Sequence, residues 1–142
     1  MIKEILDEYE IEELLEIFTP YFYTLKFGIV DKHVYVKKIK KYGRVIALYE
    51  NNDVVGFATF YCNNNESREA FLSYIGIKQI YSGRGYGKKL MGKVLEICKQ
   101  NSMTTIKLEV RKENSNAISF YKKLGFIQMT DNKQSIYFSM NL

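Results

Sequence analysis

Residues 73–91 read SYIGIKQIYSGRGYGKKLM and combine two patterns in one short stretch. The part that ends at Ile77 is rich in β-branched and aromatic residues, which favour a strand. Glycines follow at positions 83, 85 and 87, and apolar residues then recur at helical spacing as far as Gln100. A strand, a glycine-rich loop and a helix in this order predict a site where backbone N–H groups approach a phosphate.

Two better-known phosphate-binding loops do not fit this spacing. The P-loop requires a glycine at position 82 and Ser or Thr at position 89, where the chain has Ser82 and Lys89. The dinucleotide-binding pattern requires a further glycine where Lys88 or Leu90 stands. From the loop alone, a glycine-rich turn without any ligand remains the alternative.

The rest of the chain predicts further helices and strands on both sides of this loop. Apolar and acidic residues follow helical spacing from Ile2 to Phe18, which predicts a first helix ended by Pro20, with no separate strand before it. Asp31 is a suitable N-cap for a second helix, over residues 31–41. The remaining predicted elements are strands over 44–49, 54–61, 70–77, 105–110, 126–129 and 135–142, and a helix over 114–124 ended by Gly125. We predict one domain over residues 1–142, of mixed α/β class, with helices on both faces of a mixed sheet.

Composition excludes several classes of protein. Cys62 and Cys98 are too few for a disulfide framework, and with the single histidine, His33, they predict no metal site. No apolar run approaches the roughly 20 residues of a membrane span. We therefore expect a cytoplasmic protein without membrane association, as a monomer or a homodimer.

Charge is unevenly distributed along the chain. The net charge is +5, yet seven of the 16 acidic residues lie between Glu4 and Glu16. The basic remainder is expected to attract anions, such as a phosphorylated cofactor, an acidic surface or nucleic acid. Nucleic acid is the least favoured of these, because no aromatic residues alternate with the lysines at 37–41.

Two motifs occur in a fixed order between about residues 70 and 127. The first is Ile75-Gly76-Ile77 followed by Ser82-Gly83-Arg84-Gly85-Tyr86-Gly87, and the second is Leu108-Glu109-Val110-Arg111 followed by Asn114, Phe120-Tyr121 and Leu124-Gly125-Phe126. Together they resemble the GCN5-related N-acetyltransferase (GNAT) family, and the second motif is most similar to that of ribosomal-protein alanine N-acetyltransferases. The resemblance implies a mostly antiparallel sheet in which one parallel strand pair splays apart. It also implies transfer of an acetyl group from acetyl-CoA to an amine.

The resemblance places acetyl-CoA along the first motif. The backbone of Ile75, Gly76 and Ile77 would pair with the pantetheine arm, and the amide near Ile77 would meet the oxyanion. The pyrophosphate would lie on backbone amides of the loop, which are those of Ser82, Gly83, Arg84, Gly85, Tyr86, Gly87 and Lys88. Family members commonly have Arg or Gln where this chain has Ser82, which predicts weaker or shifted phosphate binding. Asn114 matches the asparagine that caps the next helix near the cofactor.

The resemblance also suggests catalytic residues. Tyr121 matches the tyrosine proposed as general acid, and its hydroxyl would donate a hydrogen bond to the leaving sulfur. Many family members keep a glutamate in the strand before the glycine loop, and this chain has no carboxylate over residues 71–75. Glu109 resembles instead the glutamate assigned as general base in ribosomal-protein alanine N-acetyltransferases, and it is the candidate base that the resemblance implies. The alternative for Glu109 is neutralisation of Lys107 and Arg111 on the same strand face.

The amine acceptor, a small molecule or a peptide N-terminus, is not identified by the sequence. Family members form the acceptor pocket where Tyr21, Phe22, Tyr23 and Phe27 stand here. Acids of the first helix would guide a cationic amine toward this pocket. The alternative is that they form only the solvent-facing side of an amphipathic helix, which carries such acids without any role in binding. Two alternatives remain: a weakly active acyl-CoA-binding module of the same fold, and a basic nucleic-acid-binding domain.

Overall fold

The computed structural model describes residues 1–21 and 30–142. The elements in chain order are β1 (Ile2–Glu4), α1 (Glu8–Phe18), the short 3-10 turn η1 (Thr19–Tyr21), α3 (Lys32–Tyr42), β2 (Arg44–Glu50), β3 (Asp53–Tyr61), β4 (Glu69–Ile77), a second 3-10 turn η2 (Gln79–Tyr81), α4 (Tyr86–Gln100), β5 (Thr105–Arg111), α5 (Ser115–Leu124), β6 (Ile127–Asp131) and β7 (Ser135–Asn141).

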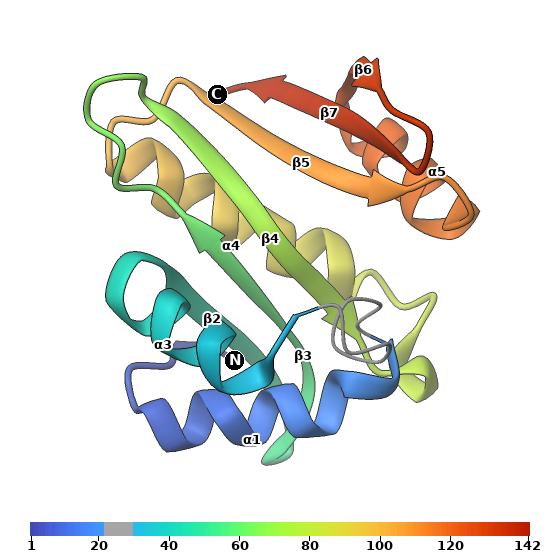
Figure 1. The fold of residues 1–142 in the computed structure, drawn as a ribbon. Coiled ribbons are helices and arrows are strands. Elements are labelled where there is room, and N and C mark those ends of the chain that lie inside the picture. The colour runs from blue at the N-terminus through green and yellow to red at the C-terminus, as the bar shows by residue number, and fades with distance from the viewer. Residues whose placement is uncertain (22–29) are drawn as a thin grey trace.

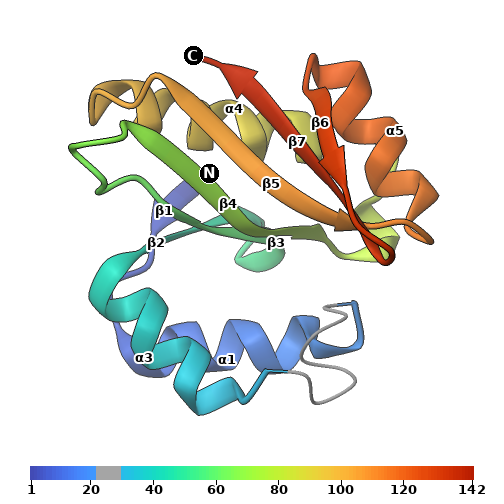
Figure 2. The ribbon, with the colours of Figure 1, turned by 45° about the horizontal axis from the view of Figure 1, so that its top comes forward.

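The described strands form one sheet of seven, in the order β1-β2-β3-β4-β5-β7-β6. Every pairing among the described strands is antiparallel except that of β4 with β5, which α4 connects. Helices α4 and α5 lie on one side of the sheet, and α1 and α3 lie on the other (Figure 2). The mixed α/β class, the mostly antiparallel sheet and the helices on both faces are confirmed.

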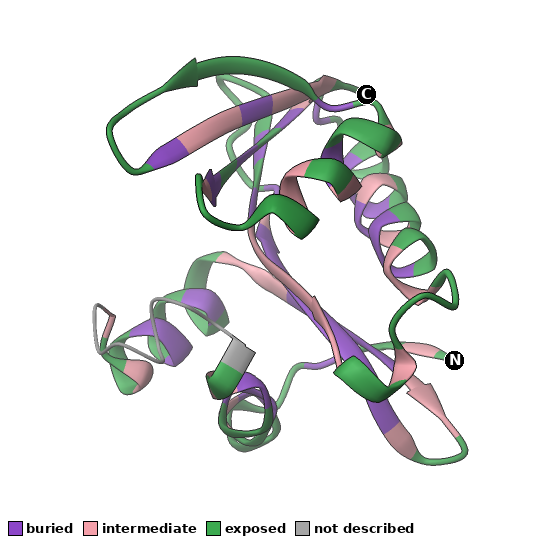
Figure 3. Cartoon of the chain, turned by 90° about the vertical axis from the view of Figure 1, so that its right-hand side faces the viewer, coloured by how far each residue is buried: buried purple, intermediate pink, exposed green. Residues whose placement is uncertain are grey.

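Each side of the sheet has its own hydrophobic core. The first core lies beneath α4 and α5 and includes Leu90, Met91 and Val94 from α4, all fully buried. The second lies beneath α1 and α3 and contains Leu15, Phe18 and Ile39. Figure 3 shows buried residues of the helices turned toward the strands, with exposed residues on their outer sides. Burying each such side chain contributes about 1.5–3 kcal/mol.

The start of the chain differs from the prediction. Residues 2–4 form β1, which pairs antiparallel with β2, and the helix begins only at Glu8. The Asp7 side chain caps that helix by accepting a hydrogen bond from the Glu10 N–H at 3.0 Å. The prediction of no separate first strand was therefore wrong. Apolar residues at helical spacing misled it, since Leu6 and Tyr9 are each 68% exposed and do not face the core.

Local signals elsewhere placed the elements correctly. Asp31 caps α3, accepting from the Val34 N–H at 3.1 Å. Asn51 and Asn52 take positive φ values of 49° and 65°, which suit the tight turn between β2 and β3. Gly125 ends α5 with φ +102°, a left-handed conformation that favours glycine.

Candidate functional site

A gap opens in the sheet where β4 leaves β5. The parallel pairing runs only from Glu69 opposite Thr105 to Leu72 opposite Leu108. Beyond Leu72, β4 stays paired with β3 as far as Ile77, while its ribbon diverges from β5 (Figure 1). The backbone edge of β4 that faces β5 is therefore unpaired over its second half, as expected for a splayed strand pair.

A β-bulge marks the start of this gap. The register skips Ser73, since Thr59 lies opposite Tyr74 and Phe60 lies opposite Leu72. The Ser73 hydroxyl lies 2.5 Å from the buried Tyr35 hydroxyl of α3, which also lies 2.6 Å from the Thr59 hydroxyl. The extra residue shifts the strand's alternation, so Ile75 packs into the same core as Leu72. Ile75 and Ile77 thereby face α4 and α5.

The glycine loop presents a row of free backbone donors. Gly83 and Gly85 have φ values of +75° and +83°, in the left-handed region, and Gly85 is the N-cap of α4. The first amide of this helix with a backbone partner is Lys89, which donates to the Gly85 carbonyl at 3.1 Å. Among the described residues, the N–H groups of 83–88 donate no hydrogen bond. Open donors at a helix start form an anion site.

Ser82 is arranged differently from the rest of the loop. Its backbone N–H and its hydroxyl both donate to the Gln79 carbonyl, at 3.0 and 2.7 Å. The row of free amides therefore starts at Gly83, and Ser82 closes the turn that precedes it.

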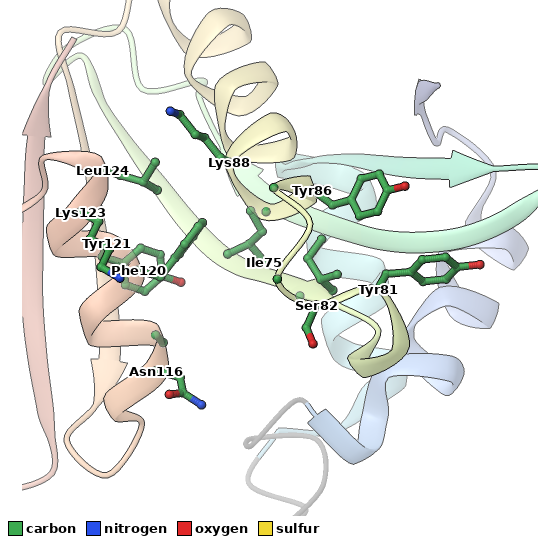
Figure 4. A pocket seen from close by; sticks show the side chains of 16 residues that line it. Ile75, Tyr81, Ser82, Tyr86, Lys88, Asn116, Phe120, Tyr121, Lys123 and Leu124 are labelled. Carbon is green, nitrogen blue, oxygen red and sulfur yellow. The ribbon is translucent and has the colours of Figure 1, made fainter.

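A cavity of about 810 Å³ joins this loop to the gap and to α5. Its wall contains nine residues that the sequence placed at the cofactor: Ile75, Gly76, Ile77, Ser82, Gly83, Gly85, Tyr86, Gly87 and Lys88. Arg84 and Asn114 do not line it. Asn114 instead caps α5, accepting from the Ala117 N–H at 3.2 Å. Figure 4 shows the cavity between the loop and α5.

Several residues of the wall were missed from the sequence. They are Tyr81, Asn116, Ala117, Phe120, Lys123 and Leu124. Helical spacing after Asn114 could have identified Phe120, Lys123 and Leu124, because one face of α5 also carries Tyr121. No sequence pattern marks Tyr81 or Asn116 as part of the cavity wall, because they reach it only through the folding of the chain.

Tyr121 extends from α5 toward β4 in this cavity (Figure 4). Its ring is held by Phe120, Phe126 and Phe138, whose centroids lie 5.5 to 6.4 Å away. The residue is only 8% exposed, and burial raises the pKa of its hydroxyl to about 12. The hydroxyl forms no hydrogen bond among the described residues, so it is a protonated donor available to a ligand.

Glu109 lies on the other side of the sheet from Tyr121. It alternates along β5 with Leu108 and Val110, which are buried beneath α5, so its own exposed side chain faces away from them. No ion pair or hydrogen bond of its carboxylate occurs within residues 1–21 and 30–142.

The charged neighbours of Glu109 have other partners. The Lys107 ammonium lies 2.7 Å from Glu69, and the Arg111 guanidinium lies 3.4 Å from Glu113. Neutralisation of Lys107 and Arg111 therefore does not require Glu109.

The acceptor side is described in part. Phe22, Tyr23, Phe27 and the side chain of Tyr21 lie outside the described residues. On α1, Glu12 lies 3.0 Å from His33 and Glu16 is paired with Lys32. Two of the α1 acids that were expected to guide the amine thus contact basic residues of α3.

No group of three or more His, Cys, Asp or Glu side chains within the described residues is arranged to hold a metal. In the same part of the chain, no helix has both the length and the apolar character needed to cross a membrane. Cys62 and Cys98 are free and buried in the core.

Comparison with known proteins identifies the family. A family model described as acetyltransferase (GNAT) family matches residues 5–126. The chain belongs to the GNAT family. It is an acetyl-CoA-dependent N-acyltransferase, and acetyl-CoA is its acyl donor.

Relatives of this GNAT protein act on different amines. The chain is 36% identical over 118 residues to a ribosomal protein bS18-alanine N-acetyltransferase of Haemophilus influenzae, covering 83% of this chain and 71% of that protein. It is 29% identical over 91 residues to the spermine/spermidine N(1)-acetyltransferase of Bacillus subtilis, covering 60% of each. A crystal structure of the PaiA N-acetyltransferase of Thermoplasma acidophilum with coenzyme A has the same fold, with a TM-score of 0.75, 16% identity, and 100% and 99% of the two chains covered.

The geometry of the GNAT site fits such a donor. Open N–H groups at 83–88 suit a pyrophosphate, and a Cβ built at Gly83 or Gly85 would meet nothing within 4 Å, so the loop is open on its outer side. Lys88 and Lys123 line the cavity from α4 and α5, where they can pair with phosphate oxygens. The unpaired edge of β4 suits an extended arm with amide groups.

Proposed function

We propose that this GNAT domain acetylates a primary amine, on a small molecule or at a peptide N-terminus, by direct attack of the amine on bound acetyl-CoA. The donor lies in the cavity between α4 and α5, with its acyl end at the gap between β4 and β5. The amine arrives from the side of the sheet that carries Glu109. Acetyl-CoA supplies a thioester that is open to attack by a neutral amine.

The residues on the two sides of the gap have different roles: one accepts a proton and the other donates a hydrogen bond. Glu109 accepts the proton that the ammonium form of the acceptor must lose, directly or through a water. When the new C–N bond forms and the C–S bond breaks, Tyr121 donates a hydrogen bond to the sulfur, which leaves as the thiolate of coenzyme A, and the second proton of the nitrogen passes to water. Because the pKa of Tyr121 is raised to about 12, this residue acts as a donor and does not transfer its proton fully to a thiolate of pKa ~8.5. The backbone near Ile77 is placed to stabilise the oxyanion.

One observation carries this proposal. A carboxylate that has no partner within residues 1–21 and 30–142 and a buried, protonated hydroxyl lie on opposite sides of the sheet where β4 and β5 separate. A general base acts on the attacking nitrogen and a leaving-group donor acts on the sulfur, and these two atoms lie on different sides of the carbonyl carbon. A gap in the sheet provides access from both sides.

The names of the relatives indicate which acceptors to test. One relative acetylates an alanine of a ribosomal protein and the other acetylates spermine or spermidine. Both acceptors are amines that are largely cationic at neutral pH. We therefore propose a cationic primary amine as the acceptor class.

The test is thiol release from acetyl-CoA with a panel of amines. The panel contains peptides that begin with alanine, the same peptides with a blocked N-terminus, spermidine and spermine. Release that depends on one class of free amine, with the acetylated product found by mass spectrometry, supports the proposal. Binding of acetyl-CoA without release for any amine would favour the weakly active acyl-CoA-binding module. Cell fractionation tests the cytoplasmic location, and a salt-dependent shift with nucleic acid tests the third alternative.

A further inference from the structure

Asp53 holds the segment that leads into the glycine loop. It is the first residue of β3, and its two carboxylate oxygens have different partners. Oδ2 accepts a hydrogen bond from the Tyr81 hydroxyl at 2.7 Å, and Oδ1 lies 3.0 Å from the Lys78 ammonium. Lys78 and Tyr81 stand at the two ends of η2, the turn between β4 and the loop. One side chain therefore fixes both ends of this turn.

Backbone contacts complete the attachment. The Lys78 N–H donates to the Val55 carbonyl at 2.8 Å, and the Ser82 N–H and hydroxyl both donate to Gln79. These contacts attach the segment before Gly83, where the row of open amides begins, to β3.

The Tyr81 ring also contacts residues of the glycine loop and of the start of α4. Its centroid lies 6.0 Å from that of Tyr86 in an edge-on arrangement, and the Arg84 guanidinium lies 5.8 Å from the Tyr81 ring. In Figure 4 the Tyr81 and Tyr86 rings both point away from α5. Tyr81 therefore contacts residues on each side of Gly85, the N-cap of α4.

Asp53 is not a ligand of the donor's phosphates, because its carboxylate would repel them. Hydrogen bonds from Tyr81 and Lys78 hold the pKa of the Asp53 carboxyl below its usual range, so the group is an anion at neutral pH. An anion near a pyrophosphate weakens its binding through repulsion. On charge alone, replacing Asp53 by asparagine would tighten acetyl-CoA binding.

We propose that Asp53 is a positioning residue for the pyrophosphate loop, acting through Tyr81 and Lys78 to hold the amides of 83–88 in place for the donor. The proposal rests on the proposed function, because it requires acetyl-CoA to bind this loop. The proposal predicts that loss of the Asp53 carboxylate weakens the binding of acetyl-CoA, whereas charge repulsion alone predicts that it strengthens this binding.

The test combines Asp53→Asn, Tyr81→Phe and the double variant. Calorimetry measures the Kd of acetyl-CoA, and steady-state kinetics separate KM from kcat. Each single variant is expected to raise the Kd and the KM of acetyl-CoA by about 3- to 10-fold, which corresponds to the net contribution of one ordinary hydrogen bond. The double variant is expected to bind acetyl-CoA as Asp53→Asn does, since that substitution already weakens the contact with Tyr81 in addition to the contact with Lys78. The kcat at saturating acetyl-CoA and the KM of the amine should stay within about twofold.

Glu50→Gln is the matched control, because Glu50 stands opposite Asp53 at the same hairpin and is the neighbouring acid. It should leave the Kd of acetyl-CoA unchanged. Unchanged or tighter binding by Asp53→Asn, or additive effects in the double variant, would overturn the proposal. If Asp53→Asn does not fold, Tyr81→Phe carries the test alone, because it leaves the hairpin intact. Failure of the wild-type protein to bind acetyl-CoA would instead overturn the proposed function, so the two failures are distinguishable.

Discussion

Glu109 and Tyr121 lie on opposite sides of the sheet, next to the place where β4 and β5 separate. Glu109 is exposed on β5, and Tyr121 is buried in the cavity beneath α5. Neither side chain forms a polar contact among the described residues, although the charged neighbours of Glu109 are paired with other acids. The two groups can therefore act on one reacting carbon without neutralising each other.

Replacing Tyr121 by phenylalanine tests the hydroxyl. The ring keeps its contacts with Phe126 and Phe138, so the fold should be retained. We expect kcat to fall by about 10- to 1,000-fold, because the leaving sulfur loses its hydrogen-bond donor, while the KM of acetyl-CoA changes little. Tyr42→Phe, an exposed tyrosine on α3, is the control. Turnover of Tyr121→Phe within twofold of wild type would show that the hydroxyl has no part in leaving-group departure.

Glu109→Gln and Glu69→Gln form a matched pair. Both remove an exposed carboxylate on neighbouring strands, but only Glu69 is paired with Lys107. As a general base, Glu109 should be worth about 100-fold or more in kcat, and its loss should be smaller at high pH, where more of the amine is already neutral. Glu69→Gln should stay near wild type. Equal effects of the two variants at every pH would rule out a special role for Glu109.

The buried tyrosines predict how stability changes at high pH. Burial raises the pKa of Tyr35 and Tyr121 to about 12, whereas tyrosines of the unfolded chain ionise near pKa ~10. The stabilisation of the folded state that comes from these two protonated hydroxyls is complete below pH ~10 and is lost as the pH rises toward ~12. In that window each lowers the free energy of unfolding by about 1.4 kcal/mol per pH unit. Urea unfolding between pH 9 and about 11 should give a shallower loss for Tyr121→Phe than for wild type, and equal slopes would contradict the assignment.

The acids of α1 are expected to have a smaller influence than the sequence suggests. Glu16 is paired with the Lys32 ammonium, which reduces the negative potential that a cationic amine meets, and the Glu12 carboxylate lies 3.0 Å from His33. Changing Glu12, Glu13 and Glu16 together to glutamine should raise the KM of the amine by only about two- to threefold, and more at low than at high salt. Glu8→Gln, at the far end of α1, serves as the control. An amine KM that does not move at low ionic strength would assign α1 a purely structural role.

Features set by neighbouring residues could be predicted from the sequence. The cap at Asp31 and the stop at Gly125 each depend on a few adjacent positions, and the structure has both. The glycine loop belongs to the same group. The splayed strand pair came from the resemblance to the family, and the unpaired edge of β4 agrees with it.

Features that depend on distant partners could not be predicted. Residues 2–4 form a strand because the edge of β2 is available, which their own sequence does not indicate. The Ser73 bulge depends on Tyr35, 38 residues away. The attachment of Tyr81 to Asp53 likewise joins two segments 28 residues apart. In each case the contacting residues are far apart in the chain, so their contact becomes apparent only in the folded structure.

Amide hydrogen exchange of the glycine loop is the most direct test of the donor site. The N–H groups of 83–88 have no hydrogen-bond partner among the described residues, so they should exchange rapidly in the free protein. Saturating acetyl-CoA should slow exchange at Gly83 to Lys88 and along β4 from Ile75 to Ile77, and leave exchange in α3 unchanged. Unchanged exchange in the loop at a concentration where calorimetry shows binding would contradict the account and place the donor elsewhere.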